Sequence, residues 1–172
     1  MSPARGAAVV ITASDGASAG ARQDESGTRV AERLESLGFP VARVVVPDDR
    51  ALIEAALRDG ARDHALVVTT GGTGLTPRDV TPQATLATID YEVPGLAEAM
   101  RAFGRATTPM ADLSRGVVGV LGRSLVINLP GSPKGALESL AAIEAVLDHA
   151  LETLAGPYDH AASRPAEGDS SD

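Results

Sequence analysis

The segment of residues 69–82, TTGGTGLTPRDVTP, has the composition of a loop that binds phosphate groups. Three of the four residues from 71 to 74 are glycines, which let the backbone approach a ligand closely and turn its amides toward an anion. Arg78 can hold a phosphate through two parallel hydrogen bonds. Asp79 would repel a bare phosphate, so we interpret it as the ligand of a cation that bridges phosphates. The other candidate ligands in this loop are Gly71, Gly72, Thr73, Gly74 and Thr76, with Thr69 and Thr70 beside them.

A simpler alternative for this loop is a tight strand-to-helix turn in which Asp79 or Thr81 only caps the following helix. We favour ligand binding because an arginine, an aspartate and four threonines accompany the glycines. The loop has neither the Gly-Lys-Ser/Thr sequence of a Walker motif nor the glycine spacing of the dinucleotide-binding fingerprint. The sequence therefore indicates phosphate chemistry outside these two common motifs.

Two further aspartates follow predicted strands at positions suited to chemistry. Asp48 comes after Pro47, at the end of a strand that we expect to be buried. Spacing alone favours a helix cap for Asp48, and its place on the same edge of the predicted sheet makes it a second candidate for metal binding or proton handling. Asp15 has the same two interpretations, and the neighbouring Ser14 can donate a hydrogen bond to a phosphate.

The segment of residues 129–134, LPGSPK, places the N-terminus of a helix in the same region. Helix N-termini carry partial positive charge and free amides, so Gly131, Ser132 and Lys134 are candidate ligands of an anion. An ordinary capped helix is an equally good interpretation of this motif on its own. A weaker candidate of the same kind precedes a predicted hairpin: Ser114 and Arg115.

Strand and helix signals alternate along the chain, and the main candidate segments follow strands. Short runs rich in valine and isoleucine predict the strands, and apolar residues at helical spacing predict the helices. The predicted strands are 7–12, 41–46, 65–69, 117–121 and 124–128. The predicted helices run from Asp24 to Gly38, from Asp48 or Asp49 to Gly60, over 82–89 and 94–103, and from Ser132 to Leu154, with a polar loop from Ser14 to Gln23.

This alternation predicts an α/β fold with a doubly wound, mostly parallel sheet and helices on both faces. The pair Gly122-Arg123 between the last two strands suits a tight hairpin, so we expect one antiparallel edge strand. In such a sheet, ligands bind beyond the carboxyl ends of the strands. The polar segments that follow the strands are therefore expected to meet on one rim of the sheet.

The composition limits the kinds of partner that the chain can bind. Its 172 residues fit one domain, which we place at 1–156, and residues 157–172 are predicted to be a disordered tail. The 23 acidic residues outnumber the 15 basic ones, and aromatic residues are scarce, which argues against broad nucleic-acid binding. No apolar run is long enough to span a membrane and the N-terminus does not look like a signal peptide, so we expect a cytoplasmic protein.

Histidine and cysteine offer no alternative chemistry. The chain has no cysteine, and its three histidines are far apart in the sequence. Neither a metal cluster nor a Ser-His-Asp triad is indicated by their spacing. Asp48 and Asp79 remain the candidates for a metal site.

The segments TGGTG (70–74), RDVTP (78–82) and LPGSPK (129–134) resemble the MogA/MoaB family of molybdenum-cofactor proteins. The resemblance runs roughly from Ala7 to Pro157. It includes the pairs Ser14-Asp15, Pro47-Asp48 and Ser114-Arg115 and the turn at 24–27. Two separated motifs in the right order, with compatible spacing, make the resemblance specific.

This resemblance implies an α/β fold, usually trimeric, that binds molybdopterin and Mg-ATP. It implies transfer of AMP to the terminal phosphate of molybdopterin and release of pyrophosphate, after which a MoeA-type protein, expected here to act in trans, inserts molybdate. By motif, Asp48 and Asp79 would be the essential acidic residues and the Mg²⁺ ligands. The residues that would hold nucleotide, pterin or phosphate are Ser14, Asp15, Gly71, Gly72, Thr73, Gly74, Thr76, Arg78, Ser114, Arg115, Gly131, Ser132 and Lys134.

Three other functions stay open on the sequence alone. A MoaB-type member could bind molybdopterin as a carrier or accessory protein without adenylylating it, although the presence of Asp48 and Asp79 favours catalysis. The chain could instead act as a scaffold module, or as a nucleotide hydrolase related to the competence-damage proteins. One departure from the family is Gly16, which follows Asp15 where many relatives have a larger and often basic residue.

Overall fold

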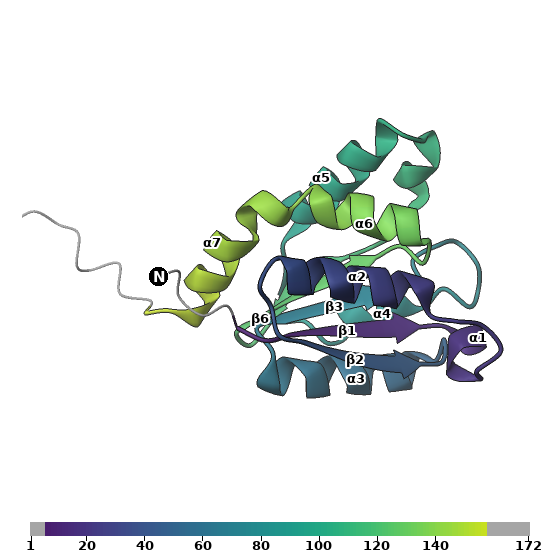
Figure 1. The fold of residues 1–172 in the computed structure, drawn as a ribbon, viewed down its shortest axis with the longest axis horizontal. Coiled ribbons are helices and arrows are strands. Elements are labelled where there is room, and N and C mark those ends of the chain that lie inside the picture. The colour runs from purple at the N-terminus through teal and green to yellow at the C-terminus, as the bar shows by residue number, and fades with distance from the viewer. Residues whose placement is uncertain (1–5, 158–172) are drawn as a thin grey trace, which may run out of the picture.

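The computed structural model describes residues 6–157, and within them one sheet has the strand order β2-β1-β3-β6-β5-β4 (Figure 1). The strands are β1 (Ala8–Ala13), β2 (Val41–Val46), β3 (Leu66–Thr70), β4 (Tyr91–Glu92), β5 (Val118–Leu121) and β6 (Ser124–Leu129). The pairings of β1 with β2, β1 with β3 and β3 with β6 are parallel. Antiparallel pairing is confined to β6–β5 and β5–β4. The predicted mostly parallel sheet with an antiparallel edge is confirmed, and the two-residue strand β4 adds to that edge.

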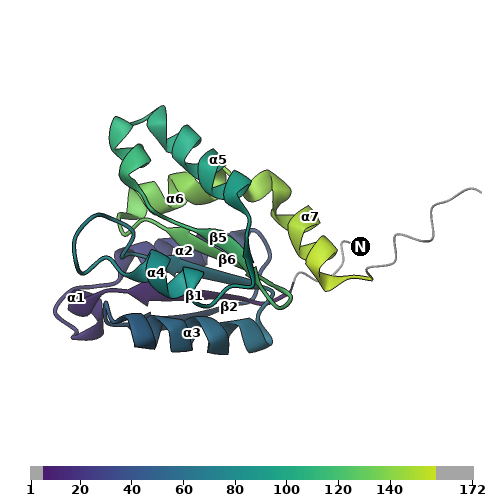
Figure 2. The same ribbon diagram turned by 180° about the vertical axis from the view of Figure 1, so that it is seen from behind.

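Helices cover both faces of the sheet (Figures 1 and 2). They are α1 (Asp15–Ser18), α2 (Glu25–Ser36), α3 (Arg50–Asp63), α4 (Thr81–Leu86), α5 (Pro94–Arg105), the 3₁₀ helix η1 (Pro109–Leu113), α6 (Pro133–Ala141) and α7 (Glu144–Ala155). Helices α2, α5, α6 and α7 share one apolar core with the sheet, which contains Val10, Leu34 and Leu140. Helices α3 and α4 pack on the other face, around Ile11 and Leu57. Neighbouring residues of β1 join different cores because successive strand side chains point to opposite faces.

None of the helices within residues 6–157 is both long enough and apolar enough to cross a membrane. The predicted tail, residues 157–172, lies outside the described part of the chain except for Pro157. The boundary of the domain at residue 156 therefore stays a prediction.

Strand β2 is exposed, which corrects the expectation that Asp48 follows a buried strand. Its four central residues are exposed, with Val44 at 41 % and Val45 at 39 %. The reason is the topology, because in the described part of the chain β2 lies at the edge of the sheet, with β1 as its single neighbouring strand. A valine-rich run predicts a strand but does not distinguish a central strand from an edge strand.

Helix α3 continues to Asp63, three residues beyond the predicted end at Gly60. Gly60 lies inside the helix and is buried against the sheet. A Cβ atom at this position would lie 2.9 Å from Cγ1 of Val9. The glycine therefore allows close packing of α3 on β1 and does not end the helix.

The long helix predicted from Ser132 to Leu154 is divided into α6 and α7, with a bend at Ala142 and Ile143. The bend changes the helix direction (Figure 1). Leu140, Ile143 and Leu147 nevertheless all enter the same core. Helical spacing of apolar residues is preserved across such a bend, so the pattern alone does not reveal it. The short helices α1 and η1 were not predicted either, because a turn of four or five residues carries little apolar periodicity.

We expect the substitution Leu57→Ala to lower the free energy of unfolding by about 2–5 kcal/mol, because Leu57 is fully buried between α3 and the sheet. The measurement is urea denaturation followed by circular dichroism. The control is Leu52→Ala on the same helix, where the side chain is 48 % exposed and the loss should be about 1 kcal/mol or less. Equal losses for the two variants would contradict the assignment of the α3 face that packs on the sheet.

Candidate functional site

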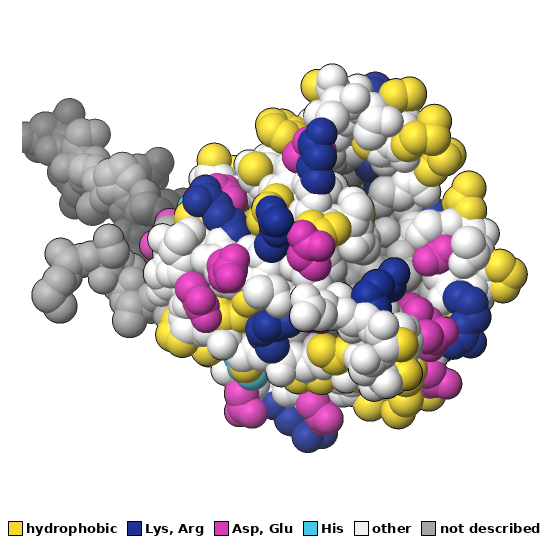
Figure 3. All heavy atoms as spheres, turned by 45° about the vertical axis from the view of Figure 1, so that its right-hand side comes forward, with side chains coloured by type: hydrophobic (Ala, Val, Ile, Leu, Met, Phe, Trp, Pro, Cys, Tyr) yellow, Lys and Arg dark blue, Asp and Glu magenta, His cyan; other side chains and the backbone are white. Residues whose placement is uncertain are grey.

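A large pocket opens where the carboxyl ends of β1, β2, β3 and β6 lie next to one another. We call this end of the sheet the rim. Its cavity volume is about 1390 Å³. It is lined by the end of β1, the first turns of α2, the Gly-rich loop (residues 71–79) and the start of α6, together with Asp48. Of the predicted site residues, it contains Ser14, Asp48, Gly71, Gly72, Asp79 and Gly131. Acidic and basic side chains are intermingled on the surface in this region (Figure 3).

Two consecutive glycines turn the chain at the end of β3. Gly71 and Gly72 have φ angles of +92° and +66°, which side chains other than glycine rarely allow. A Cβ atom on Gly71 would overlap the carbonyl oxygen of Ala13, at the end of β1. A Cβ atom on Gly131 would lie 3.3 Å from the Cα atom of Gly71. The backbones that follow β1, β3 and β6 therefore touch directly, as the sequence predicted for polar loops on one rim.

Asp48 and Asp15 are joined by two reciprocal hydrogen bonds. The Asp48 N–H donates to Oδ1 of Asp15 at 2.9 Å, and the Asp15 N–H donates to Oδ2 of Asp48 at 3.0 Å. Helix α3 is capped instead by Asp49, whose Oδ1 accepts from the Leu52 N–H at 3.0 Å. The helix-cap interpretation of Asp48 is therefore wrong, and its carboxylate lines the pocket.

Arg78 donates two hydrogen bonds to the same oxygen of Asp15, from Nε at 3.0 Å and from Nη2 at 2.6 Å. These bonds, followed by the one from the Asp48 N–H, hold the pKa of Asp15 below its usual value. The two hydrogen bonds that Arg78 was predicted to donate to a phosphate thus go to the carboxylate of Asp15. Neither Asp15 nor Arg78 is among the residues that line the large pocket. Contact between phosphate and these two residues stays a prediction.

Asp79 closes the Gly-rich loop on itself. Its Oδ2 accepts a hydrogen bond from the Thr76 N–H at 2.9 Å. The following helix α4 has Val80 as its N-cap, without a side-chain hydrogen bond, so the interpretation of Asp79 or Thr81 as a simple helix cap is wrong. Partial burial acts to raise the pKa of Asp79, but hydrogen bonds from Thr76 and Gly74 and the charge of Arg115 outweigh it and bring the pKa below its usual value.

Both predicted metal ligands lie against glycines of the loop. A Cβ atom on Gly72 would lie 3.5 Å from Oδ1 of Asp48, and one on Gly74 would lie 2.9 Å from Oδ2 of Asp79. Within the described residues, no group of three or more histidine, aspartate or glutamate side chains could hold a metal ion. A donor set of two carboxylates suits Mg²⁺, which commonly binds one or two protein carboxylates together with water and substrate phosphates.

Arg115, which was predicted to contact a ligand, donates hydrogen bonds to carbonyl groups of the Gly-rich loop. Its Nε donates to the Gly74 carbonyl at 2.7 Å, and its Nη2 donates to the Asp79 carbonyl at 2.6 Å. Its Nη1 donates to Oε1 of Gln83 at 3.2 Å, and its backbone N–H donates to the Thr73 carbonyl at 3.0 Å. Because Arg115 is occupied by these acceptors, we assign it to positioning the loop.

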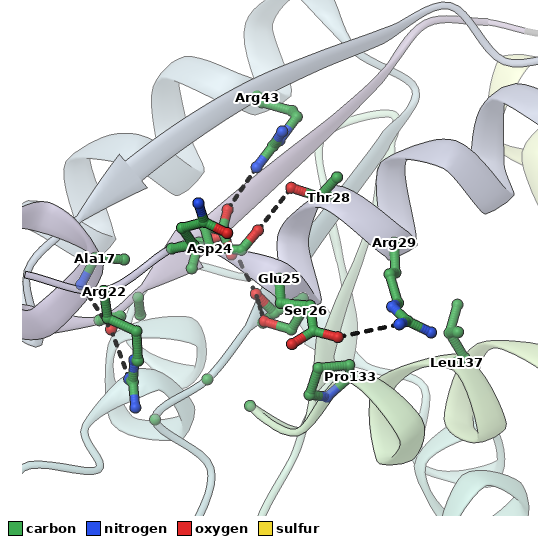
Figure 4. Close-up of a pocket in the computed structure, with 18 of the residues that line it drawn as sticks. Ala17, Arg22, Asp24, Glu25, Ser26, Thr28, Arg29, Arg43, Pro133 and Leu137 are labelled. Atoms are coloured by element: carbon green, nitrogen blue, oxygen red, sulfur yellow. Dashed lines mark hydrogen bonds and ion pairs between the residues drawn. The ribbon is translucent and has the colours of Figure 1, made fainter. Parts of the chain in front are cut away.

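A chain of polar side chains at the base of the pocket was missed by the sequence analysis. Ser26 donates to Thr70, Thr70 donates to Thr12, and Thr12 donates to Oδ2 of Asp24, at 3.3, 3.3 and 2.8 Å. Arg43, from β2, donates to the same oxygen of Asp24 at 2.7 Å (Figure 4). Threonines at the ends of two buried strands, Thr12 next to last in β1 and Thr70 last in β3, were the available signal, since buried hydroxyls require partners.

Four further predicted residues line a smaller, mainly apolar cavity of about 280 Å³ between α5, η1 and α6. It is lined by Thr73, Gly74, Ser114 and Ser132, so the consecutive residues Gly72 and Thr73 face different cavities. Thr76 and Lys134 line neither cavity. Lys134 is exposed, with Nζ 3.8 Å from Oε1 of Glu138. The structure thus divides the predicted site between two cavities that share the Gly-rich loop.

The chain is similar to proteins named for molybdopterin or for molybdenum-cofactor biosynthesis. Residues 9–149 match the protein family described as "Probable molybdopterin binding domain". The chain is 40 % identical over 154 residues to the molybdopterin adenylyltransferase of Helicobacter pylori strain J99, covering 87 % of this chain and 88 % of that protein. It is 41 % identical over 155 residues to the molybdenum cofactor biosynthesis bifunctional protein of Synechococcus elongatus, covering 89 % of this chain but only 48 % of that protein. The crystal structure of the molybdopterin biosynthesis enzyme MoaB from Thermus thermophilus is 50 % identical, with a TM-score of 0.81, and the match covers 87 % of this chain and 96 % of that one.

We expect Gly71→Ala to destabilise the protein by about 1–3 kcal/mol or more, because the new Cβ atom would overlap the Ala13 carbonyl and force a left-handed φ angle. Thermal and urea denaturation would measure the loss. The control is Gly95→Ala in α5, where a Cβ atom has no neighbour within 4 Å and stability should be unchanged or slightly higher. An unchanged stability of the Gly71 variant would contradict the close contact between β1 and the loop.

We expect the carboxyl group of Asp79 to titrate below its ordinary pKa of 3.8 in the folded protein. Because the folded-state pKa is lower than the unfolded-state pKa, ionised Asp79 stabilises the fold above pH 3.8, and this contribution is lost as the pH falls through the folded-state value. Carboxyl-detected NMR titration gives the midpoint. Arg115→Gln should raise it, because a nearby positive charge is removed. A midpoint at or above 3.8 in the wild type would show that burial outweighs the hydrogen bonds.

Proposed function

This chain belongs to the molybdopterin-binding domain family, and we propose that it is a molybdopterin adenylyltransferase of molybdenum-cofactor biosynthesis. The reaction transfers AMP from ATP to the terminal phosphate of molybdopterin and releases pyrophosphate. One observation carries the proposal: Asp48 and Asp79, from distant parts of the sequence, present carboxylates to one pocket beside the same Gly-rich loop. Adenylyltransferase relatives at about 40 % identity along most of their length support it.

The reaction needs positioning and charge neutralisation more than covalent chemistry by the protein. An oxygen of the molybdopterin phosphate attacks the α-phosphorus of ATP, and the bond from that phosphorus to the oxygen bridging to the β-phosphate breaks. The substrate therefore supplies its own nucleophile, which is consistent with a pocket that has no serine-histidine pair among its lining residues. The two substrates would meet at the loop that separates the large pocket from the smaller cavity.

Asp48 and Asp79 would hold Mg²⁺, which when bound supplies positive charge to the phosphates of ATP and to the departing pyrophosphate. Each carboxylate is oriented before any ligand arrives. The Asp15 N–H bonds to Asp48, and the Thr76 N–H bonds to Asp79. Such preorganisation lowers the cost of assembling charged groups during the reaction. Arg115 contributes by binding the carbonyl groups of the loop that carries Asp79.

The partners expected from the family form the rest of the proposal. We propose that the adenylylated product passes to a MoeA-type molybdate-insertion protein acting in trans, and that the chain works as a homotrimer in the cytoplasm. The match to 88 % of the length of the Helicobacter pylori adenylyltransferase supports adenylylation as the step that this domain performs.

We expect Asp79→Asn to reduce molybdopterin-dependent pyrophosphate release from Mg-ATP by about 100-fold or more, because an oriented charge beside the phosphates is lost. Binding of molybdopterin should persist, because the variant keeps the shape of the side chain. The measurement is pyrophosphate release by the purified protein with and without molybdopterin. The matched control is Asp59→Asn, an exposed aspartate in α3 that pairs with Arg62 outside the pocket, which should keep full activity.

Different results identify other functions. Tight binding of molybdopterin by the wild type without pyrophosphate release would make the protein a carrier. Release of free AMP from ATP without molybdopterin would make it a hydrolase. Full activity of Asp79→Asn would remove Asp79 from the mechanism and leave the reaction intact.

A further inference from the structure

Four arginines line the large pocket, and three of them are paired with carboxylates. Arg29 pairs with Glu25 at 3.1 Å, Arg33 with Glu144 at 2.6 Å and Arg43 with Asp24 at 2.7 Å. The fourth, Arg22, has no carboxylate within ion-pair distance in the part of the chain that the structure describes. Its guanidinium group points away from the Asp24–Arg43 pair (Figure 4). The pocket therefore contains one arginine whose charge is not already balanced by a neighbouring acid.

Arg22 is held in place by neutral groups. Its Nη2 donates to Oγ of Ser14 at 3.1 Å, and that oxygen also accepts from the Ala17 N–H at 3.2 Å as the cap of α1. The backbone N–H groups of Ala21 and Arg22 both donate to the Gly16 carbonyl, at 2.9 and 3.1 Å. The loop from 14 to 22 thus closes on itself and carries the side chain of Arg22 to the pocket.

Gly16 provides the space for this arrangement. A Cβ atom at residue 16 would lie 3.6 Å from both Cβ and Nε of Arg22, and 3.9 Å from its Cζ. The side chain of Arg22 therefore lies along Gly16 at van der Waals distance, and a large residue at position 16 would displace it. Many relatives have a larger and often basic residue at the position of Gly16. In this chain the guanidinium group of Arg22, six residues further along, lies beside that position.

The remaining donors of Arg22 suit an anion. A guanidinium group has five N–H donors in a planar fork, and among the described residues the side chain of Arg22 donates to Ser14 alone. The other charged residues of the pocket that have no arginine partner within residues 6–157 are acidic: Glu32, Asp48 and Asp79. Without a bound cation, the negative charge of these three side chains would repel a phosphate group. An arginine without a carboxylate partner in the same pocket offers two-pronged hydrogen bonds to phosphate oxygens.

We propose that Arg22, held by Ser14 and accommodated by Gly16, binds a phosphate group of the substrates in the large pocket. The inference rests on the proposed function for the identity of those substrates. The same chemistry occurs in the polyphosphate of ATP and in the terminal phosphate of molybdopterin. Arg22 orients that phosphate at the wall of the pocket formed by α1, while Asp48 and Asp79 act at the Gly-rich loop.

The test compares the wild type with Arg22→Gln, Arg22→Lys and the control Arg62→Gln. Arg62 has the same charge, is exposed in α3 and lies outside the pocket. Calorimetry measures the binding of inorganic pyrophosphate, and steady-state kinetics gives KM for ATP and for molybdopterin. We expect Arg22→Gln to weaken pyrophosphate binding and to raise the KM of one substrate by about tenfold or more, with a smaller change for Arg22→Lys and none for Arg62→Gln. Thermal unfolding should be nearly unchanged, because Arg22 is exposed.

The outcomes separate this inference from the proposed function. A higher KM for ATP alone places Arg22 on the nucleotide phosphates, and a higher KM for molybdopterin alone places it on the pterin phosphate. Unchanged KM values and pyrophosphate affinity in Arg22→Gln would overturn the inference while leaving adenylylation established. If Arg22→Gln weakens pyrophosphate binding but the wild type does not adenylylate molybdopterin, the inference is supported and the proposed function is overturned.

Discussion

Direct contact between backbones at the carboxyl ends of three strands is the constraint on which the pocket depends. The turn at Gly71 passes under the Ala13 carbonyl and against Gly131, with no side chain between the three segments. These contacts leave no room for a Cβ atom at Gly71 and little room for one at Gly131, so the loop that follows β3 can lie close against both neighbouring segments. The loop passes Asp48 and closes on itself through Asp79. Glycines from two separate segments of the sequence thus allow the loop to lie beside both carboxylates.

The electrostatics of the pocket follow from how its charges are paired. Most of its arginines are neutralised by acids of neighbouring elements, as in the pair formed by Arg43 and Asp24. The carboxylates of Asp48 and Asp79 accept hydrogen bonds from backbone N–H groups, which orient them without cancelling their charge. The pocket therefore keeps negative charge beside its loop, where we propose that a divalent cation binds, and positive charge at Arg22. This separation suits a substrate that arrives as a metal–phosphate complex.

The fold was predictable from local patterns, and the failures have a common physical cause. Alternating strand and helix signals were sufficient for the order and type of the main elements, because a buried strand and an amphipathic helix differ in period. The same patterns could not show that β2 lies at an edge, that Gly60 lies inside α3, or that the last helix bends at Ile143. Each of these depends on what packs against the element. In the site, Asp48 stands out because it follows a strand end and Asp79 because it lies in the Gly-rich loop, whereas the roles of Arg115 and of the Thr12–Asp24 chain require knowledge of which distant groups they meet.

The exposed edge of the sheet has a consequence for the behaviour of the protein at high concentration. Among residues 6–157, strand β2 pairs with β1 alone, so within this part of the chain the N–H and C=O groups along its outer side have no strand partner. Valine-rich edges are prone to pairing with a strand from another molecule, which leads to aggregation. Arg43 interrupts the valines near the middle of β2, and its ion pair with Asp24 keeps its charged side chain beside the strand. Charged side chains on edge strands disfavour the addition of a strand from another molecule, so the position of Arg43 in β2 works against such pairing.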